Sequence, residues 1–240
     1  MSGSTSLCIL SLALVLQTVF GASPLYHFCT SNSNFTARSP YESSLNKLIA
    51  TLSVKTPPTG FAKASKGQNS QDTAYGSSLC RGDVSKEDCK TCVVEAGGEI
   101  RKRCEYNKGA TIWYDNCMFK YTDQNFFGQI DYNLRVYMWN VNNVSDPTTF
   151  NAKTKKLLSK LAQEAYEVEK LYAVGETKLD KSTKLYGLTQ CTRDLSSADC
   201  KTCLENAIAE LPNCCDGKEG GRVLAGSCNF RYEIYPFVNA

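Results

Sequence analysis

The stretch Asp88-Cys89-Lys90-Thr91-Cys92 occurs a second time, residue for residue, as Asp199-Cys200-Lys201-Thr202-Cys203, 111 positions further along the chain. Three more cysteines keep the same interval on either side of this motif, and so does a Tyr-Gly pair upstream of it. The matching residues are Tyr75-Gly76 and Tyr186-Gly187, Cys80 and Cys191, Cys104 and Cys215, and Cys117 and Cys228. Chance does not hold five cysteines in constant register, so the chain contains two copies of one module.

The repeat divides the 240 residues into two predicted domains, residues 23–127 and residues 133–238. Each copy is large enough to bury a small core of its own. Hydrophobic residues make up 42% of the chain and charged residues 21%, which are ordinary values for a globular protein and exclude a disordered chain. The 13 cysteines are too few for a fold held by disulfides alone, so core and bridges are expected to share the stabilisation.

Each copy opens with the same order of local patterns. Aromatic and β-branched residues over 26–29 and 136–139 predict a strand at the start of each copy. Apolar residues at helical spacing over 45–52 and 157–165 predict a helix after that strand. Trp113 and Trp139 are interpreted as core residues.

A second helix is expected to begin near each CxxC motif and to run through residues 93–103 and 204–211, with Pro212 ending the later one. Residues 110–120 and 222–236 then predict strands around a turn. The predicted fold class is therefore α+β: two tandem disulfide-stapled modules, each with two helices packed on an antiparallel β-sheet. Residues 125–140 read as β-rich and contain no Gly/Ser linker, so we expect the two modules to pack together.

The N-terminus predicts export from the cell. The first 22 residues carry no charged side chain, residues 7–19 are largely apolar, and small residues follow, which is typical of a secretory signal peptide over residues 1–22. No later segment is apolar and long enough to span a membrane. The predicted localisation is extracellular, and two sequons, at Asn34 and Asn143, predict N-glycosylation.

Charge and histidine content exclude several classes of function. The formal net charge of +3 is too small to indicate a nucleic-acid partner. His27 is the only histidine, so no histidine cluster exists for a metal and a hydrolase triad is improbable. The sequence therefore predicts a protein that is not an enzyme, with no metal and no cofactor.

The CxxC motifs have three interpretations: zinc ligands, a redox dithiol or structural bridges. An oxidising extracellular space disfavours free thiolates, and the βαβ pattern of a thioredoxin-like fold is missing. Structural bridges are therefore the favoured interpretation of Cys-x8-Cys-x2-Cys in both copies.

These features resemble a known family. The Cys-x8-Cys-x2-Cys spacing, the Tyr-Gly pair before it and the run Cys228-Asn229-Phe230-Arg231-Tyr232-Glu233 are similar to the ginkbilobin-homologous, or salt-stress-response/antifungal, domain of land plants. Two tandem copies behind a signal peptide resemble a plant cysteine-rich repeat secretory protein. The same double module forms ectodomains of cysteine-rich receptor-like kinases and of plasmodesmata-located proteins.

The resemblance implies a disulfide pattern. Carried over by position, the bridges are Cys29–Cys104, Cys80–Cys89 and Cys92–Cys117 in the first copy, and Cys191–Cys200 and Cys203–Cys228 in the second. The third bridge has no counterpart in the second copy, because the position equivalent to Cys29 is Asn140. Cys214 and Cys215 are left unassigned: they bond each other, stay as thiols, or pair outside the chain. Adjacent cysteines form only a strained disulfide, so this pair is a candidate for a labile or intermolecular bond. The alternative is a buried, unreactive pair.

The resemblance also implies a carbohydrate site. A mannose-binding antifungal member of the family contacts sugar through an Asn, an Arg and a Glu. The Arg and Glu positions correspond to Arg222 and Glu233 in the second copy, and to Thr111 and Thr122 in the first. The Asn position holds Thr30 in the first copy and approximately Val141 in the second. A guanidinium beside a carboxylate suits vicinal sugar hydroxyls, whereas the structural alternative is a cross-strand ion pair between Arg222 and Glu233.

Three functions remain open from the sequence. The first is a lectin-like secreted protein that binds mannose-type or cell-wall glycans in antifungal defence. The second is an extracellular partner of receptor-like kinase ectodomains in stress signalling. The third is an extracellular thiol redox factor that uses Cys214 and Cys215.

Overall fold

The computed structural model describes residues 22–238, so the predicted signal peptide, residues 1–22, lies outside the described residues except for Ala22. The first module contains the strands β1 (Tyr26–Cys29), β2 (Phe61–Lys66), β3 (Ala74–Cys80), β4 (Ala110–Trp113) and β5 (Cys117–Thr122), and the helices α1 (Pro40–Lys55) and α2 (Lys86–Arg103). The second contains β6 (Arg135–Trp139), β7 (Tyr172–Lys178), β8 (Lys184–Cys191), β9 (Gly221–Ala225) and β10 (Cys228–Glu233), and the helices α3 (Pro147–Tyr166), α4 (Ser197–Ala209) and α5 (Leu211–Cys215).

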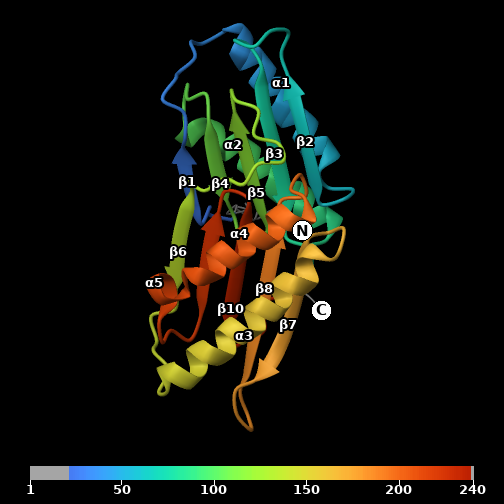
Figure 1. Ribbon diagram of the computed structural model, residues 1–240. Coiled ribbons are helices and arrows are strands. Elements are labelled where there is room, and N and C mark those ends of the chain that lie inside the picture. The colour runs from blue at the N-terminus through green and yellow to red at the C-terminus, as the bar shows by residue number, and fades with distance from the viewer. Residues whose placement is uncertain (1–21, 239–240) are drawn as a thin grey trace, which may run out of the picture.

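Both modules use one sheet topology. The strand order is β1-β4-β5-β3-β2 in the first sheet and β6-β9-β10-β8-β7 in the second, and all strand pairs are antiparallel. Helices cover one face of each sheet, α1 and α2 behind the first and α3 and α4 in front of the second (Figure 1). The predicted α+β architecture is therefore confirmed.

The repeated Asp-Cys-Lys-Thr-Cys motif begins a helix in each module. The Ser85 hydroxyl accepts a hydrogen bond from the backbone N–H of Asp88 at 3.0 Å, and Ser196 does the same for Asp199 at 3.1 Å. These are N-caps, which satisfy a backbone donor that the first helical turn leaves unpaired. A serine three positions before each motif thus fixes where α2 and α4 start, and with them the positions of Cys89 and Cys200 in the first turn.

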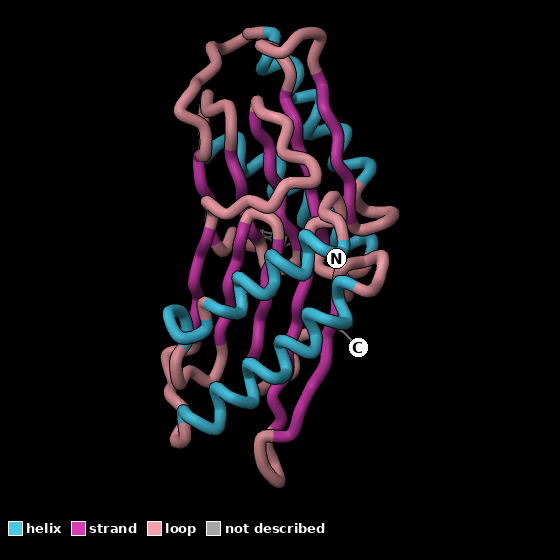
Figure 2. Tube along the Cα trace, in the orientation of Figure 1, coloured by secondary structure: helices cyan, strands magenta, loops and turns pink. Residues whose placement is uncertain are grey.

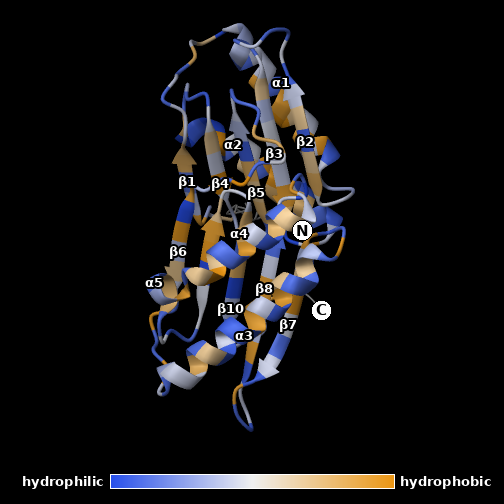
Figure 3. Cartoon of the chain, in the orientation of Figure 1, coloured by the Kyte–Doolittle hydropathy of each residue, from blue (hydrophilic) through white to orange (hydrophobic). Residues whose placement is uncertain are grey.

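The repeated Tyr-Gly pair has a packing cause. A Cβ atom on Gly76 would lie 2.9 Å from a methyl group of Leu48 on α1, and one on Gly187 would lie 2.8 Å from a methyl group of Leu161 on α3. Only glycine lets each helix approach its sheet this closely. The helices mix hydrophilic and hydrophobic residues along their length, as amphipathic helices do (Figure 3).

The two modules pack against each other through the sheet faces that carry no helix, which we call the open faces. Apolar side chains from both open faces form a third buried cluster beside the two module cores, with Trp113 and Met118 from the first module and Leu224 from the second. The Gln190 side chain also donates to the carbonyl oxygen of Cys80 at 3.0 Å. The expected packing of the modules is confirmed, and their helices lie on opposite outer sides of the molecule (Figure 2).

Several local predictions were wrong. Pro212 does not end the second-module helix: α4 already ends at Ala209, and Pro212 lies in the first turn of α5, where a proline without an N–H is tolerated. Within residues 125–140, only β6 is a strand. Trp113 is buried as predicted, but Trp139 is 55% exposed at the end of an edge strand.

Candidate functional site

Strand alternation places the predicted sugar-contact residues on the open face of the second sheet. In β9, Val223 belongs to the module core, so the adjacent Arg222 points to the opposite face. In β10, Phe230 and Tyr232 belong to the core, so Arg231 and Glu233 share the open face with Arg222. The fold therefore brings together charged residues that are separated by a turn.

Arg222 is held by the first module. Its Nη1 lies 2.7 Å from Oδ1 of Asp115, a residue of the turn between β4 and β5. The side chain of Arg222 is only 11% exposed, and its Nε is buried without a hydrogen-bond partner in the described chain. Burial lowers the pKa of Arg222 to about 10, with Asp115 acting in the other direction, so the guanidinium stays protonated at neutral pH.

Glu233 pairs with Arg231 rather than with Arg222. The Nε of Arg231 lies 3.0 Å from Oε1 of Glu233. Across the two strands, Arg222 lies directly opposite Arg231, so the cross-strand ion pair with Glu233 considered from the sequence does not form. The guanidinium of Arg231 also lies 4.3 Å from the ring centre of Phe237, and its Nη2 donates to the Tyr235 hydroxyl at 3.4 Å.

One cleft of about 400 Å³ is lined by the side chains of Arg222, Arg231 and Glu233. Residues of both modules line it: Leu25, Asp115, Met138, Trp139, Asn140, Gly220, Gly221, Arg222, Arg231, Glu233 and Tyr235. Asn140 therefore reaches the cleft although it is one position away from the aligned one, whereas Val141, at the approximately aligned position, does not line it. Sequence reasoning missed Arg231, although it lies in the quoted Cys-Asn-Phe-Arg-Tyr-Glu run.

The equivalent face of the first module carries no such set. Thr111, at the position of Arg222, is completely buried. Lys120, at the position of Arg231, is closed off by an ion pair of 2.5 Å with Asp131 of the connecting segment and lies 4.6 Å from the ring centre of Phe126. At the positions of Arg222 and Glu233 the first module has Thr111 and Thr122, so only the second module presents a guanidinium and a carboxylate there.

The structure contains six disulfides among the described cysteines. They are Cys29–Cys104, Cys80–Cys89, Cys92–Cys117, Cys191–Cys200, Cys203–Cys228 and Cys214–Cys215. The first five are the pairs that the resemblance implies. The last joins the two unassigned neighbours, which are 8% and 1% exposed.

The remaining predicted sites lie on the surface. Asn34 and Asn143 are both exposed. Each forms an isolated antiparallel β-bridge within its own module, Asn34 with Asn107 and Asn143 with Lys218. Within residues 22–238 no cluster of three or more His, Cys, Asp or Glu residues is arranged to hold a metal ion. No helix in this part of the chain is long and apolar enough to cross a membrane.

With this geometry in place, comparison with known proteins assigns the family. Residues 28–124 and 138–235 each match the family described as salt stress response/antifungal. The chain belongs to this family, and it contains two copies of its domain. Family and fold together define a defence-related protein of secretory type.

Relatives match over the whole length. The antimicrobial ginkbilobin-2-like protein of Castanea crenata is 59% identical over 235 residues, which cover 98% of this chain and 97% of that protein. Cysteine-rich repeat secretory protein 38 of Arabidopsis thaliana is 54% identical over 233 residues, covering 96% and 92%.

The fold matches solved ectodomain structures. The tandem DUF26 ectodomain of the Arabidopsis thaliana cysteine-rich receptor-like protein PDLP8 superposes with a TM-score of 0.79 at 25% identity, covering 89% of this chain and 98% of that one. The corresponding ectodomain of PDLP5 gives a TM-score of 0.74 at 26% identity.

Proposed function

We propose that this protein is a secreted, non-enzymatic lectin whose second module binds mannose-type or cell-wall glycans in the extracellular space of the plant. The observation that carries the proposal is that Arg222 and Glu233, which lie on different strands, line the same cleft of about 400 Å³. The antimicrobial relative and the antifungal family description support a role in defence against fungi.

The chemistry of the cleft suits a sugar. Sugar hydroxyl groups both donate and accept hydrogen bonds, so a guanidinium donor close to a carboxylate acceptor can bind neighbouring hydroxyls. Arg222 and Arg231 supply donors and Glu233 supplies an acceptor. The Asn140 amide adds a donor, while its oxygen accepts from the backbone N–H of Asn142 at 3.0 Å. Tyr235, at 46% exposure, adds an aromatic ring at the rim.

A glycan array that includes mannose oligosaccharides tests the proposal. We expect the oxidised protein to bind mannose-type glycans, and Arg222→Ala and Glu233→Gln to weaken binding by more than about tenfold, since each removes a charge-assisted hydrogen bond. Thr122→Ala, at the first-module position equivalent to Glu233, is the matched control and keeps wild-type affinity. Equal binding by all four proteins, or none by the wild type, overturns the proposal.

A second candidate is an extracellular partner of receptor-like kinase ectodomains. It is favoured by one relative, cysteine-rich receptor-like protein kinase 25 of Arabidopsis thaliana, which is 37% identical over 98% of this chain, while the match covers 36% of that kinase. Direct binding of the purified protein to purified ectodomains of this class tests it, with no complex at micromolar concentrations as the result against it.

The redox hypothesis has less support. A reactive cysteine needs access to solvent, whereas Cys214 and Cys215 are buried. An insulin-reduction assay in which the Cys214/Cys215 double variant matches the wild type would exclude this function.

A further inference from the structure

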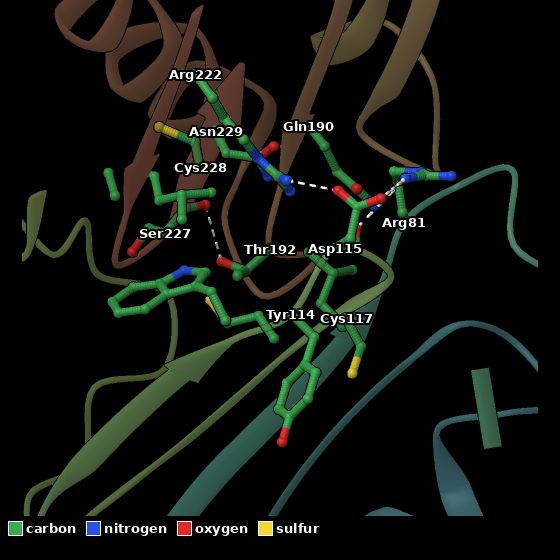
Figure 4. A pocket seen from close by; sticks show the side chains of 15 residues that line it. Arg81, Tyr114, Asp115, Cys117, Gln190, Thr192, Arg222, Ser227, Cys228 and Asn229 are labelled. Atoms are coloured by element: carbon green, nitrogen blue, oxygen red, sulfur yellow. Dashed lines mark hydrogen bonds and ion pairs between the residues drawn. The ribbon is translucent and has the colours of Figure 1, made fainter. Parts of the chain in front are cut away.

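Asp115 is a residue of the first module that lines the cleft of the second. It lies in the turn between β4 and β5, and its carboxylate is 51% exposed. One oxygen, Oδ1, accepts from Nη1 of Arg222 at 2.7 Å and from Nη1 of Arg231 at 3.2 Å. The other, Oδ2, accepts from Nη1 of Arg81 at 3.1 Å. Figure 4 shows the carboxylate between the guanidinium groups of Arg222 and Arg81.

Arg222 and Arg231 need this carboxylate. They are directly opposed across β9 and β10, and like charges in this position repel each other. Both side chains are largely buried, at 11% and 18% exposure, where solvent screens the repulsion poorly. Asp115 therefore fixes the positions of the two donors that the proposed sugar site uses.

Asp115 also sets the net charge of the cleft. Three cations, Arg81, Arg222 and Arg231, are paired with three anions. The anions are Asp83, Asp115 and Glu233, so the formal charge of the cluster is zero. A neutral sugar can enter without leaving a charge unpaired, whereas the carboxylate of a uronic acid would compete with Asp115 for the same guanidinium groups.

We propose that Asp115 completes the sugar site across the module boundary and makes it select neutral glycans over acidic ones. This inference rests on the proposed lectin function. The inference goes beyond the lectin proposal because it assigns the sugar specificity to a residue of the first module, which is outside the three family contact positions. The two modules must then stay docked for the second to bind its ligand.

The test compares two probes on the full-length oxidised protein, mannotriose as the neutral sugar and trigalacturonate as the acidic one. We expect the wild type to prefer mannotriose. Asp115→Asn leaves the cluster with a net charge of +1 and is expected to shift the ratio of the two affinities toward trigalacturonate by more than about tenfold, with binding of the acidic probe falling as salt rises. Glu87→Gln, which removes an exposed charge at the start of α2, is the matched control and leaves the ratio unchanged.

The outcomes separate the two proposals. If Arg222→Ala and Glu233→Gln weaken mannotriose binding by more than about tenfold but Asp115→Asn leaves the ratio unchanged, the role of Asp115 is overturned and the lectin function stands. If the wild type binds neither probe, both proposals fail. A purely structural role predicts that Asp115→Asn weakens both probes equally, and that result also contradicts the selectivity.

Discussion

At the scale of single residues, the sequence could predict the parts of the site that the family motif contains and not their partners. Arg222 and Glu233 are found by counting from cysteines, and both line the cleft. Asp115 was not found, because it lies 107 residues before Arg222 and meets it only through the packing of the modules. The sequence also does not show that Trp139 is exposed. An aromatic residue in a strand is buried only where other elements pack against it, and Trp139 lies at the end of an edge strand.

Gly220 tests the placement of Glu233. A Cβ atom at this position would lie 1.9 Å from Oε2 of Glu233, so Gly220→Ala must displace the carboxylate. Because the clash is with the end of a flexible side chain, we expect the fold to persist and mannotriose affinity to fall by about tenfold, as for loss of one charge-assisted hydrogen bond. Calorimetric titration, with a melting curve to show that the variant is folded, measures this; unchanged affinity would contradict the role of Glu233.

At the scale of secondary-structure elements, helices with an apolar stripe were predictable and edge hairpins were not. The periodic leucines of α1 and α3 indicate helices directly. Strand β2, with the sequence Phe-Ala-Lys-Ala-Ser-Lys, has Phe61 as its only strong β-former, and it lies at a sheet edge, where it pairs with one strand only. The boundary between α4 and α5 was missed because proline is compatible with a first helical turn as well as with a helix end.

Two adjacent glycines in α2 allow a test of helix packing. A Cβ atom on Gly98 meets nothing within 4 Å, whereas one on Gly97 would lie 2.8 Å from Ile49 of α1. We expect Gly98→Ala to stabilise the protein by about 0.5–1 kcal/mol, because alanine loses less backbone entropy in a helix. Gly97→Ala should lack this gain or destabilise. Thermal unfolding of the two variants checks the order, and a more stable Gly97→Ala variant would refute the packing.

The disulfides differ in what they constrain. The bridge between Cys29 and Cys104 spans 75 residues, whereas the one between Cys214 and Cys215 spans one. Since a bridge stabilises mainly by restricting the unfolded chain, replacing the first pair by serine should cost about 3–5 kcal/mol. Replacing Cys214 and Cys215 by alanine should cost far less. Denaturant titration of both double variants measures the difference, and equal losses would count against this account.

At the scale of the whole molecule, the sequence indicated that the modules pack together but not through which surfaces. The repeat predicts two copies of one fold, and the lack of a flexible linker predicts contact. The open faces meet because Trp113, Met118 and Leu224 would otherwise expose apolar area on both sheets. On the open face, each of them has a polar residue two positions away along its strand, namely Thr111, Lys120 and Arg222, so the strands do not reveal a second apolar face.

Acid should weaken this module interface. Burial opposes ionisation of Asp115, but Arg222, Arg231 and Arg81 outweigh it and hold the pKa of the carboxyl below its ordinary 3.8. A lowered folded pKa stabilises the folded state fully above pH 3.8, and this contribution is lost as the pH falls through the folded value. We expect the melting temperature of the wild type to fall more steeply below pH 4 than that of Asp115→Asn. Parallel curves would show that Asp115 does not link the modules.

A crystal structure of the oxidised protein with mannotriose tests most directly whether the cleft of the second module binds sugar. We expect sugar density in the cleft between β6, β9 and β10, with hydroxyl groups within hydrogen-bond distance of Arg222 and Glu233. Sugar bound elsewhere on the molecule, or an open cleft without sugar in crystals soaked at high concentration, would contradict it.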